Sequence, residues 1–154
     1  GHAFAKAQIE ADMTLPLSGT VFISVNDFDK SAASKIARDL HRMGFSLMAT
    51  AGTTEYLAKI GLPVTHVKKV SEGSPNALEA IREGRVQLVI NTPLGGTAYD
   101  DGKAIRGAAH LYRVPVVTTL SAAQATVQGI QSLLKKPLRV RSLQAHYAAV
   151  AKKA

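Results

Sequence analysis

The stretch VQLVIN at residues 86–91 decides the fold class, because it is a short, mostly apolar run without a polar face. Such a run indicates a strand that is buried on both faces, as in the middle of a parallel sheet. Similar runs predict further strands at residues 20–25, 45–49, 64–70 and 115–118. Because segments with helical spacing separate them, we predict an α/β fold with a doubly wound, mostly parallel sheet flanked by helices.

The helices are expected between these strands and after the last one. Helical spacing and stop signals place them at residues 30–43, 55–60, 75–83, 103–112 and 121–136. Asp29 and Ser121 are the expected N-terminal caps of the first and last helices, and Pro75 suits the first turn of the third. A final edge strand is expected at residues 138–143, and residues 12–18 are interpreted as linker-like.

Composition restricts the class of protein. The chain has 154 residues, 46% of them hydrophobic, which fits one compact domain. It has no cysteine, which excludes disulfides and thiol nucleophiles and favours a reducing compartment, so we expect the cytoplasm. No apolar run approaches the ~20 residues of a membrane span, so no membrane partner is expected. Gly1 and His2 are interpreted as a cloning scar.

The net charge of +8 comes from the C-terminal part of the chain, because residues 102–154 contain no carboxylate. Such an excess suits an anionic partner, a protein-facing surface or a solvated face. The basic cluster consists of Lys135, Lys136, Arg139 and Arg141. No aromatic residue interleaves with this cluster, so a base-stacking surface is missing there and we expect no nucleic-acid partner.

Small polar residues follow the ends of the expected strands. Ligands of parallel α/β sheets bind outside the C-terminal strand ends, so these residues form the candidate site. Residues 50–54 (TAGTT) place hydroxyl and backbone N–H groups at a strand-to-helix turn, which suits a phosphate. The alternative is a helix cap without a ligand. Lys30 and Lys69 either add positive charge to the same rim or are ordinary surface lysines.

Asn91 and Thr92 end the central strand, where they either face a ligand or form an ordinary strand end. The chain lacks GxGxxG and GxxxxGK[ST], so ordinary ATP or NAD binding has no support. Asp100 and Asp101 are interpreted as caps of the following helix. The histidines lack metal-ligand spacing and Ser121 has no neighbouring base, so we expect no metal site and no catalytic residue.

These loops are part of a longer pattern that resembles the methylglyoxal-synthase-like (MGS-like) domain at the C-terminal end of the carbamoyl phosphate synthetase large chain. The resemblance covers residues 19–147. It rests on GTVFISV (19–25), DK (29–30), ATAGT (49–53), KVSEG (69–73), VINTP (89–93) and IRGAA (105–109). It implies an MGS-like fold, with a cloning scar and interdomain segment at residues 1–18 and a basic tail at residues 148–154.

The resemblance implies a regulatory domain that is not itself an enzyme. In that family a nucleoside monophosphate, with UMP favoured and IMP possible, binds the strand rim and alters ATP-dependent carbamoyl phosphate synthesis for pyrimidine and arginine pathways. The implied partners are the catalytic half of the same chain, a glutamine-hydrolysing ligase that uses ATP with Mg or Mn, and through it the glutaminase small subunit. No cofactor is implied for this segment. The implied nucleotide and phosphate contacts are Lys30, Thr50, Gly52, Thr53, Lys69, Asn91 and Thr92.

Some positions depart from the family pattern. Pro93 stands where some members have a ligand-contacting Thr, and Gly96 and Thr97 stand where some have two arginines. The sequence therefore does not decide between UMP and IMP as the ligand. The alternative function is a methylglyoxal-synthase-type phosphate lyase. That enzyme needs a carboxylate directly after the central strand, where this chain has Thr92, and a loop histidine, where it has Tyr99. A purine-synthesis cyclohydrolase domain shares the sheet, but its downstream motifs are missing from the sequence.

Overall fold

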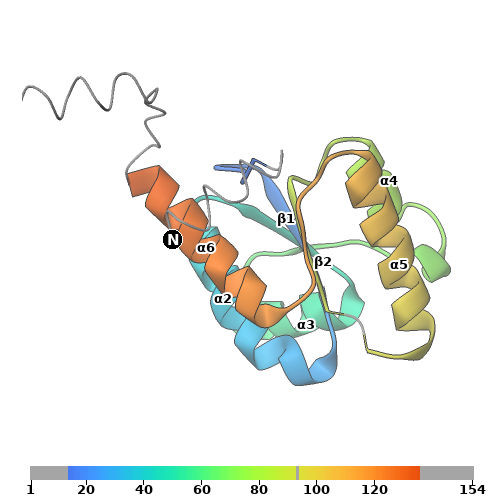
Figure 1. Cartoon of the computed structure of the whole chain (residues 1–154). Coiled ribbons are helices and arrows are strands. Elements are labelled where there is room, and N and C mark those ends of the chain that lie inside the picture. Colours follow the sequence, from blue (N-terminus) through green and yellow to red (C-terminus); the bar gives the residue numbers. More distant parts are fainter. Residues whose placement is uncertain (1–13, 93, 136–154) are drawn as a thin grey trace, which may run out of the picture.

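The computed structural model describes residues 14–92 and 94–135, and its centre is a parallel sheet (Figure 1). The sheet has five strands in the order β3-β2-β1-β4-β5, and every neighbouring pair is parallel. The strands are β1 (Thr20–Val25), β2 (Ser46–Ala49), β3 (Thr65–His66), β4 (Leu88–Thr92) and β5 (Val116–Val117). The predicted fold class, a doubly wound parallel sheet, is therefore confirmed.

Helices cover both faces of the sheet. Within the described segments they are η1 (Asp27–Asp29), α2 (Lys30–Arg42), α3 (Ala51–Lys59), η2 (Val70–Glu72), α4 (Ala77–Arg82), α5 (Gly96–Leu111) and α6 (Leu120–Lys135). Helices α2, α3 and α6 contribute to one apolar layer, and α4 and α5 contribute to the other. The chain therefore winds around the sheet in both directions from its centre.

Strand β4 shows why an apolar run without alternation marks the centre of the sheet. All five of its residues are buried. Leu88 and Ile90 belong to the layer under α2 and α6, whereas Val89 belongs to the layer under α4 and α5. Leu15, in the stretch expected to be linker-like, is also buried in the first layer, so this part of the chain is packed on the core rather than free of it.

Two expected elements around the third strand are shorter than predicted. Strand β3 covers two exposed residues instead of residues 64–70, because it lies at the edge of the sheet and pairs with β2 alone. Helix α4 begins at Ala77, not at Pro75. The Asn76 side chain caps it by accepting hydrogen bonds from the N–H groups of Leu78 and Glu79, at 3.0 and 3.3 Å.

Two later helices start at other residues than expected. Helix α5 begins at Gly96, well before residue 103, because Gly95 and Gly96 adopt positive φ angles that turn the chain directly into the helix. Asp100 and Asp101 therefore lie inside α5, and their interpretation as caps is wrong. Helix α6 is capped by Thr119 rather than Ser121: the Thr119 hydroxyl oxygen accepts a hydrogen bond from the Ala122 N–H group at 3.2 Å.

The remaining expectations about local structure have mixed outcomes. Asp29 occupies the N-cap position of α2, but its side chain makes no capping hydrogen bond. The expected strand at residues 138–143, the basic tail and the cloning scar lie outside the described residues. No helix in the described part of the chain is long and apolar enough to cross a membrane.

Candidate functional site

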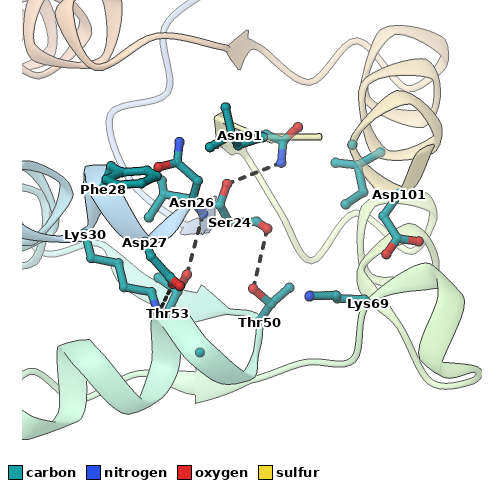
Figure 2. Close-up of a pocket in the computed structure, with 15 residues that line it drawn as sticks. Ser24, Asn26, Asp27, Phe28, Lys30, Thr50, Thr53, Lys69, Asn91 and Asp101 are labelled. Carbon is teal, nitrogen blue, oxygen red and sulfur yellow. Dashed lines mark hydrogen bonds and ion pairs between the residues drawn. The ribbon is translucent and has the colours of Figure 1, made fainter. Parts of the chain in front are cut away.

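A cleft of about 290 Å³ lies at the C-terminal edge of the sheet, beside the ends of the central strands β1 and β4 (Figure 2). Strands β2 and β3 lie on one side of this central pair, and strand β5 lies on the other. The loops after β1 and β4 consequently diverge and leave room for a ligand. Six of the seven predicted site residues line the cleft, namely Lys30, Thr50, Gly52, Thr53, Lys69 and Asn91.

Thr92 is the predicted site residue that the structure does not bring into the cleft. It is buried, and its hydroxyl oxygen lies 3.4 Å from the Asn26 Nδ2 atom, which donates a hydrogen bond to it. The Thr92 carbonyl oxygen accepts two more hydrogen bonds from Asn26, from its backbone N–H group at 3.1 Å and from Nδ2 at 3.0 Å. Thr92 therefore joins the loop after β1 to the end of β4 instead of lining the site.

The start of α3 faces the cleft without a side-chain cap. Thr50 is the N-cap residue, but it makes no capping hydrogen bond; its hydroxyl group lies 3.4 Å from the Ser24 hydroxyl group instead. Thr53, in the first turn, is buried and its oxygen accepts a long hydrogen bond from the Val25 N–H group at 3.5 Å. The first N–H groups of a helix have no partner within it and carry a partial positive charge, so this end of the cleft suits an anion.

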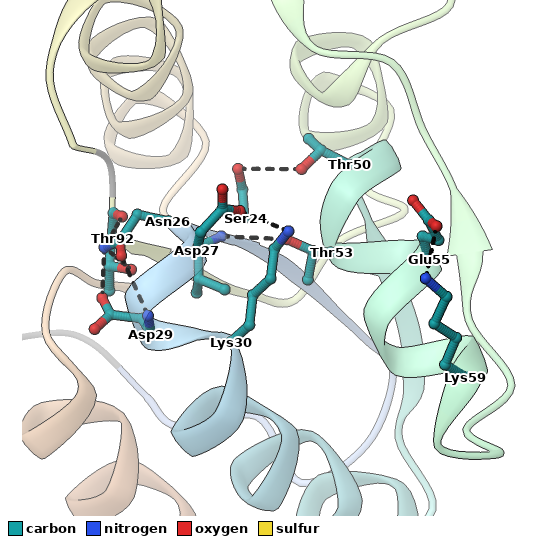
Figure 3. Close-up of polar contacts among 11 residues, drawn as sticks. Ser24, Asn26, Asp27, Asp29, Lys30, Thr50, Thr53, Glu55, Lys59 and Thr92 are labelled. Atoms are coloured by element: carbon teal, nitrogen blue, oxygen red, sulfur yellow. Dashed lines mark hydrogen bonds and ion pairs between the residues drawn. The ribbon is translucent and has the colours of Figure 1, made fainter.

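Lys30 extends from the start of α2 toward the start of α3 (Figure 3). Its Nζ atom would lie 3.2 Å from a Cβ atom at Gly52, so the absence of a side chain at Gly52 gives the ammonium group room beside the helix. The Lys30 side chain is 18% exposed and forms an ion pair with Asp27 at 2.7 Å. The hydrogen bond and charge of Lys30, with a further contribution from Lys69, hold the pKa of Asp27 below its usual value.

Lys69 supplies a second positive charge, and its ammonium group points toward Thr50 (Figure 2). Across residues 14–92 and 94–135 this ammonium group has no hydrogen bond and no ion pair. The backbone around it is nevertheless fixed. The Lys69 N–H group donates to Glu72 Oε2 at 2.9 Å, and the next turn is tied to α5 through Ser71.

Asp101 makes the connection to Ser71, and sequence reasoning misassigned it. One carboxylate oxygen accepts the Ser71 N–H group at 2.9 Å, and the other accepts the Ser71 hydroxyl group at 2.7 Å. Asp101 lies four and seven residues before Ile105 and Ala108, which are both buried on the inner face of α5. That spacing was the available signal, and it was missed because the helix was expected to begin after Asp101.

Asn91 lines the cleft and is held in a fixed orientation. Its Oδ1 atom accepts a hydrogen bond from the Arg106 guanidinium group at 3.0 Å, and its Nδ2 atom donates to the Ser24 carbonyl oxygen at 3.2 Å. The second Nδ2 hydrogen remains available to an acceptor on a ligand. Arg106 is itself positioned over the Tyr99 ring, 5.7 Å from its centroid. Sequence reasoning used Arg106 as part of a motif but assigned it no role.

The cleft also contains Ser24, Asn26, Asp27 and Phe28, to which sequence reasoning assigned no ligand contact. Their signal was positional, because they follow directly from β1 at the same sheet edge as Thr50 and Asn91. No group of three His, Cys, Asp or Glu side chains in the described part of the protein is arranged to hold a metal ion.

Comparison with known proteins gives a consistent result. The model of the MGS-like domain family matches residues 32–118. The chain is 47% identical over 148 residues, 96% of its length, to the carbamoyl phosphate synthase large chain of Acidobacterium capsulatum. It is 49% identical over 144 residues, 93% of its length, to the C-terminal section of that large chain in Methanopyrus kandleri. The chain spans 14% and 27% of the lengths of these two relatives.

A solved structure of methylglyoxal synthase from Elizabethkingia anophelis resembles the chain with a TM-score of 0.58. The match covers 86% of this chain and 92% of that one, at 16% sequence identity. At this identity the likeness shows a shared fold and says nothing about a shared reaction.

Proposed function

The chain belongs to the family of MGS-like domains, and we propose that it is the allosteric regulatory domain of a carbamoyl phosphate synthase (synthetase) large chain. In this proposal the cleft binds a nucleoside monophosphate, with UMP favoured over IMP, and the domain has no catalytic residue of its own. High identity to large chains over nearly the whole sequence, including one C-terminal section, supports the placement in that protein.

The observation that carries the proposal is the ammonium group of Lys69, which has no ion pair among the residues that the structure describes and faces the uncapped start of α3 across Thr50. A phosphate group at this point would accept hydrogen bonds from helix N–H groups and from the threonine hydroxyls. It would also form an ion pair with the Lys69 ammonium group. Lys30 lies beside the same helix end and is held there by Asp27. Asp27 and Asp101 also line the cleft, but Asp27 pairs with Lys30 and Asp101 accepts two hydrogen bonds from Ser71. Lys69 and the start of α3 therefore remain to attract an anion.

The remainder of the cleft suits a small organic group attached to the phosphate. Asn91 offers one N–H donor whose direction is fixed by Arg106 and Ser24, which fits a hydroxyl or carbonyl oxygen of a nucleoside. A volume of about 290 Å³ is near the lower limit for small-molecule sites. A monophosphate is therefore a better match in size than a triphosphate.

The alternative is a methylglyoxal-synthase-type phosphate lyase, which the shared fold brings into consideration. A lyase needs a free carboxylate to remove a proton from its substrate. The carboxylates that line the cleft are Asp27, which pairs with Lys30, and Asp101, which accepts two hydrogen bonds from Ser71. The residue at the end of β4 is Thr92, which is no general base near neutral pH. These contacts favour the regulatory role.

The proposal for the longer protein follows from the same relatives. ATP and Mg²⁺ or Mn²⁺ would bind in its catalytic half, and a glutaminase small subunit would supply ammonia, for carbamoyl phosphate used in pyrimidine and arginine synthesis. The cleft is connected to α5 by two contacts, Ser71 with Asp101 and Asn91 with Arg106. We therefore propose α5 as the element through which an occupied cleft acts on that catalytic half.

Calorimetric titration of the chain with UMP, IMP and dihydroxyacetone phosphate tests the proposal. We expect saturable binding of a nucleoside monophosphate that is tighter than binding of the triose phosphate, and no release of phosphate from the triose phosphate. Catalytic release of phosphate, lost on Asp27→Asn or Asp101→Asn, would replace the regulatory role by the lyase reaction.

A further inference from the structure

Phe28 is the most exposed large hydrophobic residue of the described segments, at 86%, and it lines the cleft. Leu94, which is 62% exposed, lines the same cleft. We call the exposed Phe28 ring the apolar lip. Scattered apolar residues on a surface are ordinary, but the apolar lip belongs to a site whose other side carries the ammonium group of Lys69.

The loop that carries Phe28 is fixed to the sheet. The Asn26 Oδ1 atom accepts the Asp29 N–H group at 3.2 Å, and Asn26 Nδ2 donates to the Asp29 carboxylate at 2.7 Å. Asn26 also bonds the Thr92 carbonyl oxygen with its backbone and its side chain. Helix η1 is thus tied to the ends of both central strands, so the backbone that carries Phe28 is held at the edge of the cleft before any ligand arrives. A backbone that is already ordered loses little entropy when a ligand binds.

The two chemical ends of the cleft lie apart. Figure 2 shows Phe28 on one side and Lys69 on the other, with Ser24 and Thr50 between them. A ligand that uses both ends needs an anionic group separated from a flat apolar group by a short polar spacer. Phosphate, ribose and base have this order in a nucleoside monophosphate, whereas a phosphorylated sugar has no group for the apolar lip.

We propose that Phe28 is the base-stacking residue of this cleft and that it selects nucleoside monophosphates over phosphates without a base. The proposal rests on the proposed function of the cleft. It concerns the base, which is the part of the ligand that the lysines do not contact. An aromatic ring stacks on any base through its π face. Phe28 therefore separates nucleotides from other phosphates, and it leaves the choice between pyrimidine and purine to the polar groups near Asn91.

The first test compares UMP with ribose 5-phosphate, which keeps the sugar and phosphate but has no base. Calorimetry on Phe28→Ala should show UMP binding weakened about tenfold and ribose 5-phosphate binding unchanged. Leu111→Ala is the matched control, because Leu111 is 73% exposed but lies at the other end of α5, outside the residues that line the cleft. It should change neither affinity.

The second test uses the absence of tryptophan from the chain. Phe28→Trp introduces a single tryptophan, whose fluorescence should be quenched by UMP and left unchanged by ribose 5-phosphate. Equal losses for both ligands in Phe28→Ala would make Phe28 a structural residue and overturn the inference. No loss and no quenching would place the base elsewhere, which also overturns it. Wild-type protein that binds neither ligand would instead refute the proposed function itself.

Discussion

The Lys30 ammonium group and the Asp27 carboxylate lie 2.7 Å apart at the edge of the cleft (Figure 3). Asp27 therefore holds Lys30 in place, but it also occupies the charge that an incoming phosphate needs. Its carboxylate is exposed, so the pair itself contributes little to stability. We therefore expect the Asp27 carboxylate to affect ligand binding more than stability.

Asp27→Asn should tighten UMP binding several-fold at low salt, because it removes an anion that competes for Lys30 and repels the phosphate. The gain should shrink when salt screens these charges. Calorimetry at two salt concentrations measures it. Glu55→Gln is the control, because Glu55 pairs with Lys59 at 2.8 Å outside the cleft lining. Weaker binding in Asp27→Asn would show that the carboxylate contacts the ligand directly.

The pH dependence of UMP binding should follow the ligand rather than the protein carboxylate. Lys30 and then Lys69 lower the pKa of Asp27, so Asp27 is charged throughout the range from pH 5 to 8. The ion pair is present above the ordinary aspartate pKa of about 3.9 and is lost only as the pH falls through the lower folded-state value. The phosphate gains its second charge near pH 6. We expect affinity to rise from pH 5 to pH 7, with the same profile in Asp27→Asn; a flat wild-type profile would argue against a phosphate contact.

Gly52→Ala should separate stability from binding. A Cβ atom at Gly52 meets the flexible end of Lys30 at 3.2 Å, so it should displace the ammonium group and cover the start of α3. UMP affinity should fall, whereas removal of a helical glycine should stabilise the fold by up to about 1 kcal/mol. Gly107→Ala, in α5 with open space around it, should give the stability gain without the loss of affinity. Unchanged affinity in Gly52→Ala would place the ligand away from α3.

Asp101→Ala should lower the free energy of unfolding by about 1–3 kcal/mol, because two hydrogen bonds from Ser71 to a charged group are lost. UMP binding should also weaken, since the turn next to Lys69 loses its connection to α5. Urea unfolding and calorimetry measure the two effects. Asp100→Ala is the control, because Asp100 is its exposed neighbour in the same helix. Equal effects of both substitutions would remove the special role assigned to Asp101.

Much of the fold could be predicted from the sequence, because buried strands and helix faces leave periodic patterns. The central strand β4 is the clearest case, since Leu88, Val89 and Ile90 serve both faces of the sheet. Element limits were less predictable where tertiary contacts decide them. The start of α5 depends on the conformations of Gly95 and Gly96, and β3 is short because it has one neighbour.

The candidate site was predictable to the extent that it follows strand ends. Six predicted residues meet in one cleft because the C-terminal ends of parallel strands lie along one edge. Thr92 lies outside the cleft lining, where its carbonyl and hydroxyl oxygens both accept hydrogen bonds from Asn26. Arg106 bonds Asn91, fifteen residues away in sequence, and Asp101 bonds Ser71, thirty residues away. No local sequence pattern indicates hydrogen-bond partners at such separations.

The central claim is that Lys69 binds the phosphate of a nucleotide in this cleft. The most direct measurement is the melting temperature with and without UMP in wild type, Lys69→Ala, Thr53→Val and Lys68→Ala. Lys68 is the matched control, because it is the adjacent lysine but bonds the Ser74 carbonyl oxygen at 3.0 Å and does not line the cleft.

UMP at 100 times its Kd should stabilise the wild type by about 2.7 kcal/mol. Loss of a charge-assisted contact costs roughly 1.5–3 kcal/mol, so Lys69→Ala should bind more than tenfold more weakly and lose most of the shift, as should Thr53→Val. Lys68→Ala should keep the shift. A wild-type shift that persists in Lys69→Ala and Thr53→Val would contradict the assignment of this cleft as the phosphate site.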